Sequence, residues 1–359
     1  MTKNSPRILF ISRAYPPVVG GIENQNFELG EWLGKITKVT KIVNRRGKKF
    51  LPLFLPYAKL KALFLASGND AILLGDGVLA PIGWAVKLIY KKPVISVLHG
   101  LDLTYKNSLY QKFWVRFFIP KLDKFICVGQ ETVRVAKEKG LNPEKLVFIP
   151  NGIDTEKYEG DFARQDLEKI LNENLEGKKV ILTSGRLAKR KGVAWFCENV
   201  IPKLPENYIY IVAGDGADKN NIEEVIEKNN LSSRVKMLGY VSDKTRNILF
   251  HTSDIFVQPN IFVPGDMEGF GISVIEAAFC QIPVIASGIE GLKDAIKNNQ
   301  NGFLLESGNA EVWINKINEL MANNEYRKSF GQKARQFVME NYTWEKISRI
   351  YLEEIEKVL

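Results

Sequence analysis

The feature that most constrains the fold is a rhythm of short apolar segments alternating with amphipathic stretches, and it runs through the chain twice. The first half contains six apolar segments of strand length: 7–12, 38–43, 71–74, 93–99, 125–128 and 146–150. The second half contains six more: 180–184, 208–214, 235–239, 254–258, 282–287 and 302–305. Helical periodicity marks stretches between them, such as 23–33, 192–204 and 221–230. Apolar strands separated by helices predict an α/β protein with two doubly wound parallel sheets, each covered on both faces.

A chain of 359 residues is too long for one ordinary core and suits two domains. The boundary is expected after PNGIDTEKYEG (150–160), because Asn-Gly is a turn signal and a polar, charged helix (161–174) follows. We therefore predict a first domain over 1–160 and a second over 161–340. The last segment, 341–359, has helical periodicity with no strand after it, and we expect it to pack back against the first domain.

The net charge of +9 is concentrated in the first half of the chain. Residues 1–160 contain 25 Lys/Arg and 13 Asp/Glu, whereas residues 161–359 contain 25 and 28. A nucleic-acid-binding protein would be basic more uniformly, so no nucleic-acid partner is expected. The polarity fits an anionic acceptor or an anionic membrane surface facing the first domain. The alternative is a lysine-rich surface that only keeps the protein in solution.

Two stretches of the first half mix Lys/Arg with large apolar residues, namely LPYAKLKALFLA (55–66) and QKFWVRFFIPKL (111–122). Helices of this composition can lie in a membrane interface. The alternative, which we favour for 111–122, is that the aromatic side chains are buried against the sheet. No apolar run reaches the length of a membrane span, since 78–90 is interrupted by Pro81 and Lys87.

The usage of cysteine and histidine points to a cytoplasmic protein without a metal site. Cys127, Cys197 and Cys280 are odd in number and far apart, as expected for buried free thiols in a reducing compartment. The apolar stretch 8–11 is too short for a signal peptide. Only two histidines are present, and D-x-D, Walker, G-x-S-x-G and H-E-x-x-H motifs are absent. We therefore expect no metal and no cofactor, and a cytoplasmic location with peripheral contact at the inner face of the cytoplasmic membrane.

The segment EGFGISVIE (268–276) places two carboxylates eight positions apart, separated by a glycine-rich turn and the start of an apolar helix. An apolar strand precedes it at 254–260 and another follows at 282–287. Glu268 and Glu276 therefore lie in a strand–loop–helix–strand crossover, near the carboxyl end of a parallel strand, where open α/β sheets bind ligands. Bare glycine amides at a helix N-terminus suit a phosphate or sugar hydroxyl groups.

Other loops at strand ends offer further groups for an anionic ligand. GRLAKRKG (185–192) follows a strand and supplies Arg186 and Lys191, two cations of the kind that a diphosphate requires; a solvated turn is the alternative. RAYPPVVGGIE (13–23) places Gly20-Gly21 before a helix and permits close approach of an anion; a tight turn held by two prolines is the alternative. His99 leads into a polar loop, so a core role is less fitting for it than for His251, which lies on a helical stretch.

Taken in chain order, these segments resemble the retaining glycosyltransferases of family GT4, which have the GT-B fold. The matching elements cover nearly the whole chain: GGIE (20–23), HGLD (99–102), PNGID (150–154), SGRLAKRKG (184–192), AGDG (213–216), LGYVSD (238–243) and EGFGISVIEA (268–277). The resemblance implies two Rossmann-like domains facing a central cleft, with the C-terminal helix crossing back to the first.

The resemblance also implies a role for each matching residue. His99, Arg186, Lys191 and Glu268 would be catalytic: His99 at the transferred sugar, the two cations at the diphosphate, and Glu268 on sugar hydroxyl groups. Glu276 would bind the ribose hydroxyl groups. The other donor-binding positions would be Gly20, Gly21, Gly216 (position 215 is Asp215), Tyr240, Val241, Gly269, Phe270, Gly271 and Ile272. Asp102 would lie on the acceptor side.

The function expected from this resemblance is metal-independent transfer of a hexose from a nucleotide sugar to a glycan or lipid-linked acceptor, with retention of configuration. GDP-mannose is slightly favoured as donor, and a UDP-hexose or UDP-N-acetylhexosamine is the alternative. Two other classes stay open: a nucleotide-sugar 2-epimerase of the same architecture and a non-catalytic nucleotide-sugar-binding module. A two-carboxylate hydrolase is disfavoured, because Glu276 on its helix is better placed for a ribose.

Overall fold

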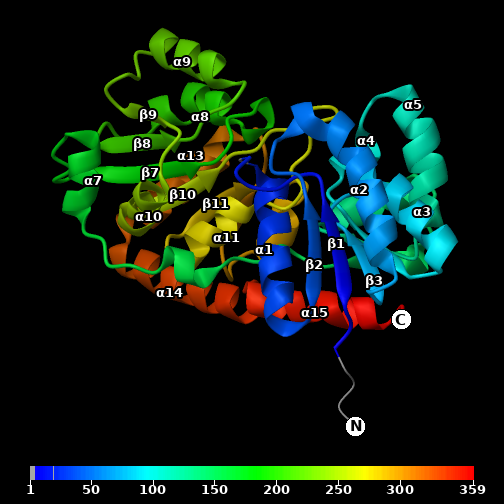
Figure 1. Ribbon diagram of the computed structural model, residues 1–359. Coiled ribbons are helices and arrows are strands. Elements are labelled where there is room, and N and C mark those ends of the chain that lie inside the picture. Colours follow the sequence, from blue (N-terminus) through cyan, green and yellow to red (C-terminus); the bar gives the residue numbers. More distant parts are fainter. Residues whose placement is uncertain (1–4, 19) are drawn as a thin grey trace. The chain divides into compact units, whose positions relative to one another are not determined.

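The computed structural model describes residues 5–18 and 20–359 and contains two six-stranded sheets (Figure 1). Every strand pairing in both sheets is parallel. The sheets match the twelve apolar segments of the sequence, because a strand flanked by helices on both faces is apolar along its whole length. The expected α/β class is confirmed.

The first sheet has the strand order β2-β1-β3-β4-β5-β6. Its strands are β1 (Ile8–Ser12), β2 (Val39–Val43), β3 (Ala71–Leu74), β4 (Val94–Leu98), β5 (Lys124–Cys127) and β6 (Leu146–Phe148). Its helices are α1 (Gly21–Ile36), α2 (Leu51–Ala66), α3 (Ala80–Tyr90), α4 (Leu101–Thr104), α5 (Ser108–Tyr110), the π-helix η3 (Gln111–Phe118), α6 (Gln130–Glu138) and α15 (Trp344–Glu356).

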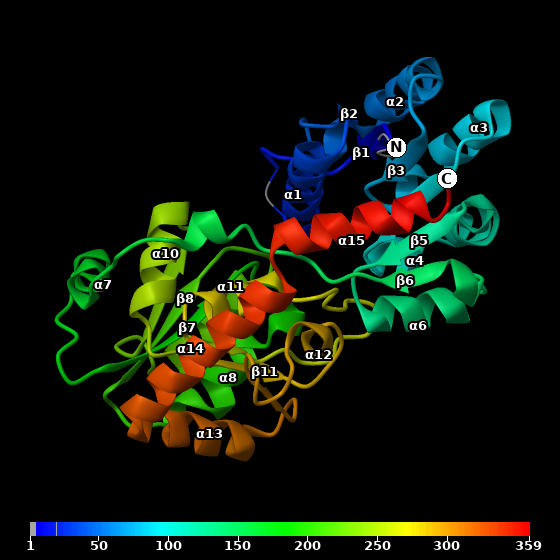
Figure 2. The same cartoon turned by 90° about the horizontal axis from the view of Figure 1, so that it is seen from below.

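Alternate side chains of β1 enter two separate cores, one on each face of the first sheet. Leu9 and Ile11 pack with α2, α3, η3 and α6. Ile8 and Phe10 pack with α1 and α15. Figure 2 shows α15 running beside α1, and the two helices are in contact. The C-terminal helix therefore covers one face of the first sheet, although the preceding segment, up to residue 343, belongs with the second.

The second sheet has the strand order β12-β11-β10-β7-β8-β9. Its strands are β7 (Lys179–Ser184), β8 (Tyr208–Ala213), β9 (Val235–Gly239), β10 (Ile255–Gln258), β11 (Val284–Ser287) and β12 (Phe303–Leu305). Its helices are α7 (Arg164–Leu171), α8 (Val193–Asn199), α9 (Lys219–Lys228), α10 (Asp243–Thr252), α11 (Ile272–Phe279), α12 (Leu292–Ala295), α13 (Ala310–Ala322) and α14 (Asn324–Asn341). The single helix expected over 192–204 ends at Asn199, because Pro202 has no N–H to continue it and lies instead in a short 3-10 turn, Ile201–Lys203.

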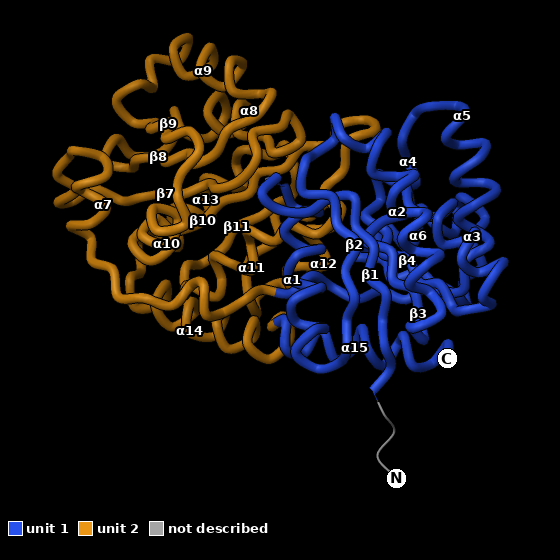
Figure 3. Tube along the Cα trace, in the orientation of Figure 1, with its two compact units in different colours: residues 1–152, 344–359 blue, residues 153–343 orange. Residues whose placement is uncertain are grey.

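The chain divides into two compact units, each built on one sheet (Figure 3). Unit 1 is Met1–Gly152 with Trp344–Leu359, and unit 2 is Ile153–Thr343. The expected division at residue 160 falls inside unit 2. Residues 153–160 belong there because Tyr158, on the 3-10 helix Thr155–Tyr158, is buried against Phe250 and Phe279. The turn signal of the sequence marks the start of this segment, whereas its packing decides to which unit it belongs.

Strand order identifies the ligand-binding edge of each sheet. In a doubly wound sheet, ligands bind outside the carboxyl ends of the strands where the order reverses. In unit 2 the order reverses between β7 and β10, and in unit 1 between β1 and β3. The loops that follow these four strands are therefore the first places to look for a site.

Within the described residues, no helix is long and apolar enough to cross a membrane. Cys127, Cys197 and Cys280 are buried and unpaired, as expected.

Candidate functional site

At the reversal point of unit 2, Glu268 lies among cations and amides from the loops after β7 and β10. The Lys191 Nζ is 2.6 Å from Glu268 Oε2, and the Arg190 Nε is 3.7 Å away. Asn260 donates from Nδ2 to the same oxygen at 3.2 Å. Burial raises the pKa of the Glu268 carboxyl, but Lys191 and Arg190 outweigh this effect and hold the pKa at about 2. Glu268 is therefore a fixed anion, and Lys191 a cation held at the end of β7.

Glycine is required where the two loops meet. Gly192 has φ +67°, and a Cβ there would lie 1.9 Å from the Pro259 carbonyl oxygen. The Ile261 amide donates to the Arg190 carbonyl oxygen at 2.8 Å, which joins the same two loops by a backbone hydrogen bond. The close approach allowed by Gly192 is thus what brings Lys191 within reach of Glu268.

The turn after Glu268 presents unpaired backbone N–H groups. Among the residues that the structure describes, the amides of Gly269, Phe270, Gly271 and Ile272 donate no hydrogen bond. Gly271 is the N-cap of α11, has φ +90° and contributes no side-chain cap. Phe270 itself is buried, with its ring 5.8 Å from that of Tyr342, so only its backbone can serve a ligand. Free amides at a helix N-terminus form an anion-binding site when a second cationic group, here Lys191, stands beside them.

Glu276 faces inward from α11 and is held by a residue from the start of unit 2. The Tyr158 hydroxyl donates to Glu276 Oε1 at 2.6 Å. Burial, reinforced by the charge of Glu276, raises the pKa of Tyr158 well above its ordinary value, so the hydroxyl keeps its proton. The Arg246 guanidinium lies 5.5 Å from the centre of the Tyr158 ring. One carboxylate oxygen of Glu276 is thus fixed, and its other oxygen accepts no hydrogen bond from the residues that the structure describes.

For the nucleotide sugar that the resemblance implies as substrate, replacing Tyr158 with phenylalanine should raise KM about threefold to tenfold with little change in kcat. Tyr158 acts only through Glu276, so we expect the loss of part of the roughly 1.5–3 kcal/mol that a hydrogen bond to a charged group contributes. Steady-state kinetics with varied donor would measure this. Tyr351→Phe is the matched control, because that hydroxyl is also buried and, among the described residues, makes one hydrogen bond, which it accepts from Gln25 at 3.5 Å. A lower kcat with unchanged KM in Tyr158→Phe would contradict the positioning role.

The other predicted residues of unit 2 lie on the same edge but are more exposed. Arg186 is exposed and makes no ion pair with any residue that the structure describes. Tyr240 is 70% exposed in the loop after β9, with Val241 partly buried beside it. The loops after β7, β8 and β9 are in close contact. The amide of Gly214 donates to the Gly239 carbonyl oxygen at 2.8 Å, and a Cβ on Gly216 would lie 2.2 Å from the Leu187 carbonyl oxygen.

Unit 1 has its own polar cluster at the reversal point of its sheet. The His99 Nε2 is 2.9 Å from the Gly75 carbonyl oxygen, which can only accept, so Nε2 carries the proton. Asp102 accepts from the amides of His99 at 3.1 Å and Gly77 at 3.0 Å. Burial raises the pKa of the Asp102 carboxyl despite these donors. Asp102 therefore shapes the His99 loop from within, and the Nδ1 of His99 makes no hydrogen bond with the residues that the structure describes.

The N-terminus of α1 also lies at this edge. Gly20 is its N-cap without a side-chain cap, and a Cβ on Gly21 would meet no atom within 4 Å. Val19, in the same loop, lies outside the described residues.

The structure adds functional candidates that the sequence analysis missed. Arg190 bridges Glu268 and Asp266, with its Nη1 3.3 Å from Asp266 Oδ1. In unit 1, the Arg13 Nε pairs with Asp76 Oδ2 at 2.7 Å. The basic run KRK (189–191) and the SR pair after the first strand were the available signals. Neither shows which cation points inward.

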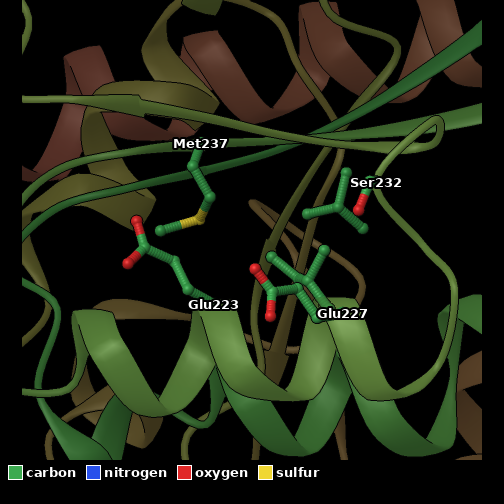
Figure 4. A pocket seen from close by; sticks show the side chains of 6 residues that line it. Glu223, Glu227, Ser232 and Met237 are labelled. Atoms are coloured by element: carbon green, nitrogen blue, oxygen red, sulfur yellow. The ribbon is translucent and has the colours of Figure 1, made fainter.

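No group of three or more His, Cys, Asp or Glu in 5–18 and 20–359 could hold a metal ion. A hollow of about 290 Å³ lies between α9 and β9, lined by Glu223, Glu227, Ser232 and Met237 among others (Figure 4). None of the predicted site residues lines it. The hollow is open and lies at the edge of the sheet, away from the reversal point.

Comparison with known proteins shows two family matches and several relatives. The family "Glycosyltransferase Family 4" matches residues 11–157, and "Glycosyl transferases group 1" matches residues 165–337. An uncharacterized glycosyltransferase of Methanocaldococcus jannaschii is 30% identical over 74% of this chain and 68% of its own length. The UDP-Gal:alpha-D-GlcNAc-diphosphoundecaprenol alpha-1,3-galactosyltransferase of Escherichia coli is 31% identical over 67% of this chain and 62% of its own.

Among solved structures, Anabaena HepE in complex with UDP superposes with a TM-score of 0.79, covering 98% of this chain and 100% of the other at 19% identity. This likeness confirms the GT-B fold. The two family matches and the archaeal relative together show that this chain is a glycosyltransferase of the group 1, family 4 type.

Proposed function

We propose that this glycosyltransferase transfers a sugar from a nucleoside diphosphate sugar to a lipid-linked acceptor, without a metal ion and with retention of configuration. The observation that carries the proposal is the anion site of unit 2, where Lys191 and Glu268 stand beside the free amides of Gly269–Ile272. A diphosphate needs cations and N–H donors, and a sugar needs a fixed carboxylate to accept from its hydroxyl groups. This edge of the sheet offers all three.

The donor is proposed to be a UDP-sugar. The E. coli relative is named for UDP-Gal, and HepE was crystallised with UDP. GDP-mannose was slightly favoured from the sequence, but neither of these two proteins is named for a GDP-sugar. In unit 2, Glu276, steadied by Tyr158, would bind the ribose, and Tyr240 and Val241 would border the base.

In the proposed reaction, the bond between C1 of the sugar and the β-phosphate oxygen breaks while C1 bonds to an acceptor hydroxyl oxygen on the same face. The hydroxyl proton passes to the departing diphosphate. Negative charge grows on that diphosphate, so cations and amides already in place lower the barrier without reorganising. Lys191 and Arg186 supply the cations, Gly269–Ile272 the amides, and Glu268 holds the sugar. For His99 of unit 1, the family resemblance implies a role at the sugar.

The acceptor is proposed to be an isoprenoid-diphosphate-linked sugar or a related lipid-linked glycan. The name of the E. coli relative specifies such an acceptor for that enzyme. The Arg13–Asp76 pair gives unit 1 a polar group of the kind needed near a diphosphate. The apolar part of such an acceptor requires a separate surface.

A thermal-shift panel of UDP, GDP and ADP sugars, followed by assays with the best donor, tests the proposal. We expect UDP-sugars to give the largest shift, and a product only when a polyprenyl-diphosphate-linked sugar is present. A new sugar nucleotide formed without acceptor would indicate the epimerase. Binding without turnover over a broad acceptor panel would indicate the binding module. A shift with GDP-mannose alone would overturn the choice of donor.

A further inference from the structure

Helix α2 of unit 1 is apolar on both its inner and its outer face. Its inner face places Phe54, Ala58, Ala62 and Ala66 in the core, one turn apart. Its outer face carries Leu53, Tyr57, Leu60 and Phe64, which are 73%, 52%, 71% and 81% exposed. A spacing of three and four residues puts these four side chains in one stripe. A helix that is apolar all round is normally covered on every side, so the outer stripe calls for a covering partner.

The stripe continues onto the neighbouring helices. Helix α3 packs against α2 and exposes Leu88 and Ile89, each about 60%. The π-helix η3 packs against α3 and exposes Phe113 and Phe117, each 44%. Figures 1 and 2 show α2 and α3 on the same side of unit 1. We call the exposed apolar side chains of α2, α3 and η3 the apolar face.

A row of aromatic rings joins the apolar face to the His99 and Asp102 loop. The Tyr110 hydroxyl donates to the Asp102 carbonyl oxygen at 2.8 Å. Ring contacts of 5.4–5.8 Å then run through Trp114, Phe118 and Trp84 to Phe117 on the apolar face. We expected the aromatic side chains of 111–122 to be buried against the sheet. Phe113 and Phe117 are exposed instead. The row therefore links the candidate sugar site to the surface within a single unit.

The charge around the apolar face has one sign. Residues 45–121 contain 13 Lys/Arg but only three Asp/Glu. Asp76 and Asp102 are buried at the polar cluster, and Asp70 pairs with Arg7. Lys61, Lys112 and Lys121 lie against the exposed rings of Tyr57, Phe113 and Phe117 respectively. Large apolar side chains interleaved with lysines are the pattern of a surface that enters the headgroup region of a membrane.

We propose that the apolar face docks into the interfacial region of an anionic phospholipid bilayer, with Leu53, Leu60 and Phe64 entering the acyl boundary. The surrounding lysines would contact anionic headgroups. A second copy of the chain fits less well, because the same positive charge would face itself across a symmetric interface. The inference rests on the proposed function, because docking would serve to bring a lipid-linked acceptor to the His99 loop along the aromatic row.

Vesicle flotation of the full chain, without donor or acceptor, tests the surface independently of catalysis. The variant Leu60→Glu/Phe64→Glu changes two side chains that contribute almost nothing to the core. Met339→Glu/Tyr326→Glu is the matched control, since these exposed apolar residues lie on α14 of unit 2. We expect wild type and control to bind phosphatidylglycerol-containing vesicles, and to bind pure phosphatidylcholine vesicles much less. The Leu60/Phe64 variant should bind the anionic vesicles at least tenfold less.

Equal binding of both variants, or no binding by wild type to either vesicle, would overturn the proposal. A wild-type dimer in light scattering that the Leu60/Phe64 variant loses, without vesicle binding, would assign the face to a second copy instead. The nucleotide-sugar thermal shift should be the same in wild type and both variants. Loss of vesicle binding with an intact thermal shift therefore tests the apolar face alone. A missing thermal shift in wild type would instead count against the proposed function.

Discussion

Lys191→Ala should lower kcat by about 10²- to 10³-fold while raising KM for the donor much less, because the Nζ acts mainly on charge that develops as the diphosphate departs. The ammonium is held 2.6 Å from Glu268 in a nearly enclosed position, so its attraction for the leaving group is little screened by water. Among the described residues, its removal also leaves the Glu268 carboxylate with Arg190, at 3.7 Å, and the side-chain amides of Asn260 and Gln258. Steady-state kinetics under saturating acceptor would separate kcat from KM.

Arg186→Ala is expected to act in the same direction as Lys191→Ala, with a greater effect on kcat than on KM. Lys189→Ala is the matched control, since that lysine is exposed two positions before Lys191 in the same 3-10 turn. The control should retain wild-type kinetics. Unchanged turnover in both the Arg186 and the Lys191 variants would refute the assignment of this loop to the diphosphate.

Glu268→Gln is expected to lower kcat/KM about 100-fold, because a charge-assisted hydrogen bond to a sugar hydroxyl contributes up to about 3 kcal/mol. The amide keeps the shape of the side chain but removes the anion between Lys191 and Arg190. The effect should be larger than that of Tyr158→Phe, since Glu268 would touch the transferred sugar directly. Glu173→Gln is the control. Glu173 is also ion-paired, with Lys178 and Lys236, but it follows α7 and lies away from the reversal point of the sheet.

The same substitution should change how stability depends on pH. The pKa of Glu268 is about 2 in the folded protein, below its ordinary value of 4.5. A depressed carboxyl pKa stabilises the fold above pH ~4.5, and this contribution of about 3 kcal/mol is lost as pH falls through the folded pKa. Wild type should therefore exceed Glu268→Gln in free energy of unfolding at pH 6, and the gap should narrow towards pH 3. Urea unfolding at the two pH values measures it. A gap independent of pH would mean that Glu268 is not held as an anion.

Much of the fold follows from the sequence. Each of the twelve strands lies within or next to a predicted apolar segment, since strands covered on both faces must be apolar throughout. Helix ends were less predictable. Pro202 ends α8 early, and the helix expected in 161–174 forms only over Arg164–Leu171. The EGFGISVIE turn was correctly expected between β10 and β11, because its glycines and its flanking strands are local features.

The composition of the site depended on contacts between distant segments. Lys191 and Glu268 are separated by 76 other residues, and only the parallel pairing of β7 with β10 and the close approach at Gly192 bring them together. Arg190 was overlooked beside Lys191 because a basic run does not reveal which side chains a turn directs inward. Tyr158 was assigned to the wrong unit. A turn signal shows where the chain bends, but it does not show against which core the following residues pack.

The sequence by itself determined the fold class, the two-sheet organisation and the loops that carry the chemistry, since these depend on periodicity, on glycine and on charge along the chain. Only the tertiary structure decided which charges meet, that Tyr158 holds Glu276, and that the outer face of α2 is left uncovered beside a row of aromatic rings. The physical reason is that strand order and packing are set by the sum of many distant contacts. A sequence pattern records the character of each segment, whereas the choice of partner belongs to the folded chain.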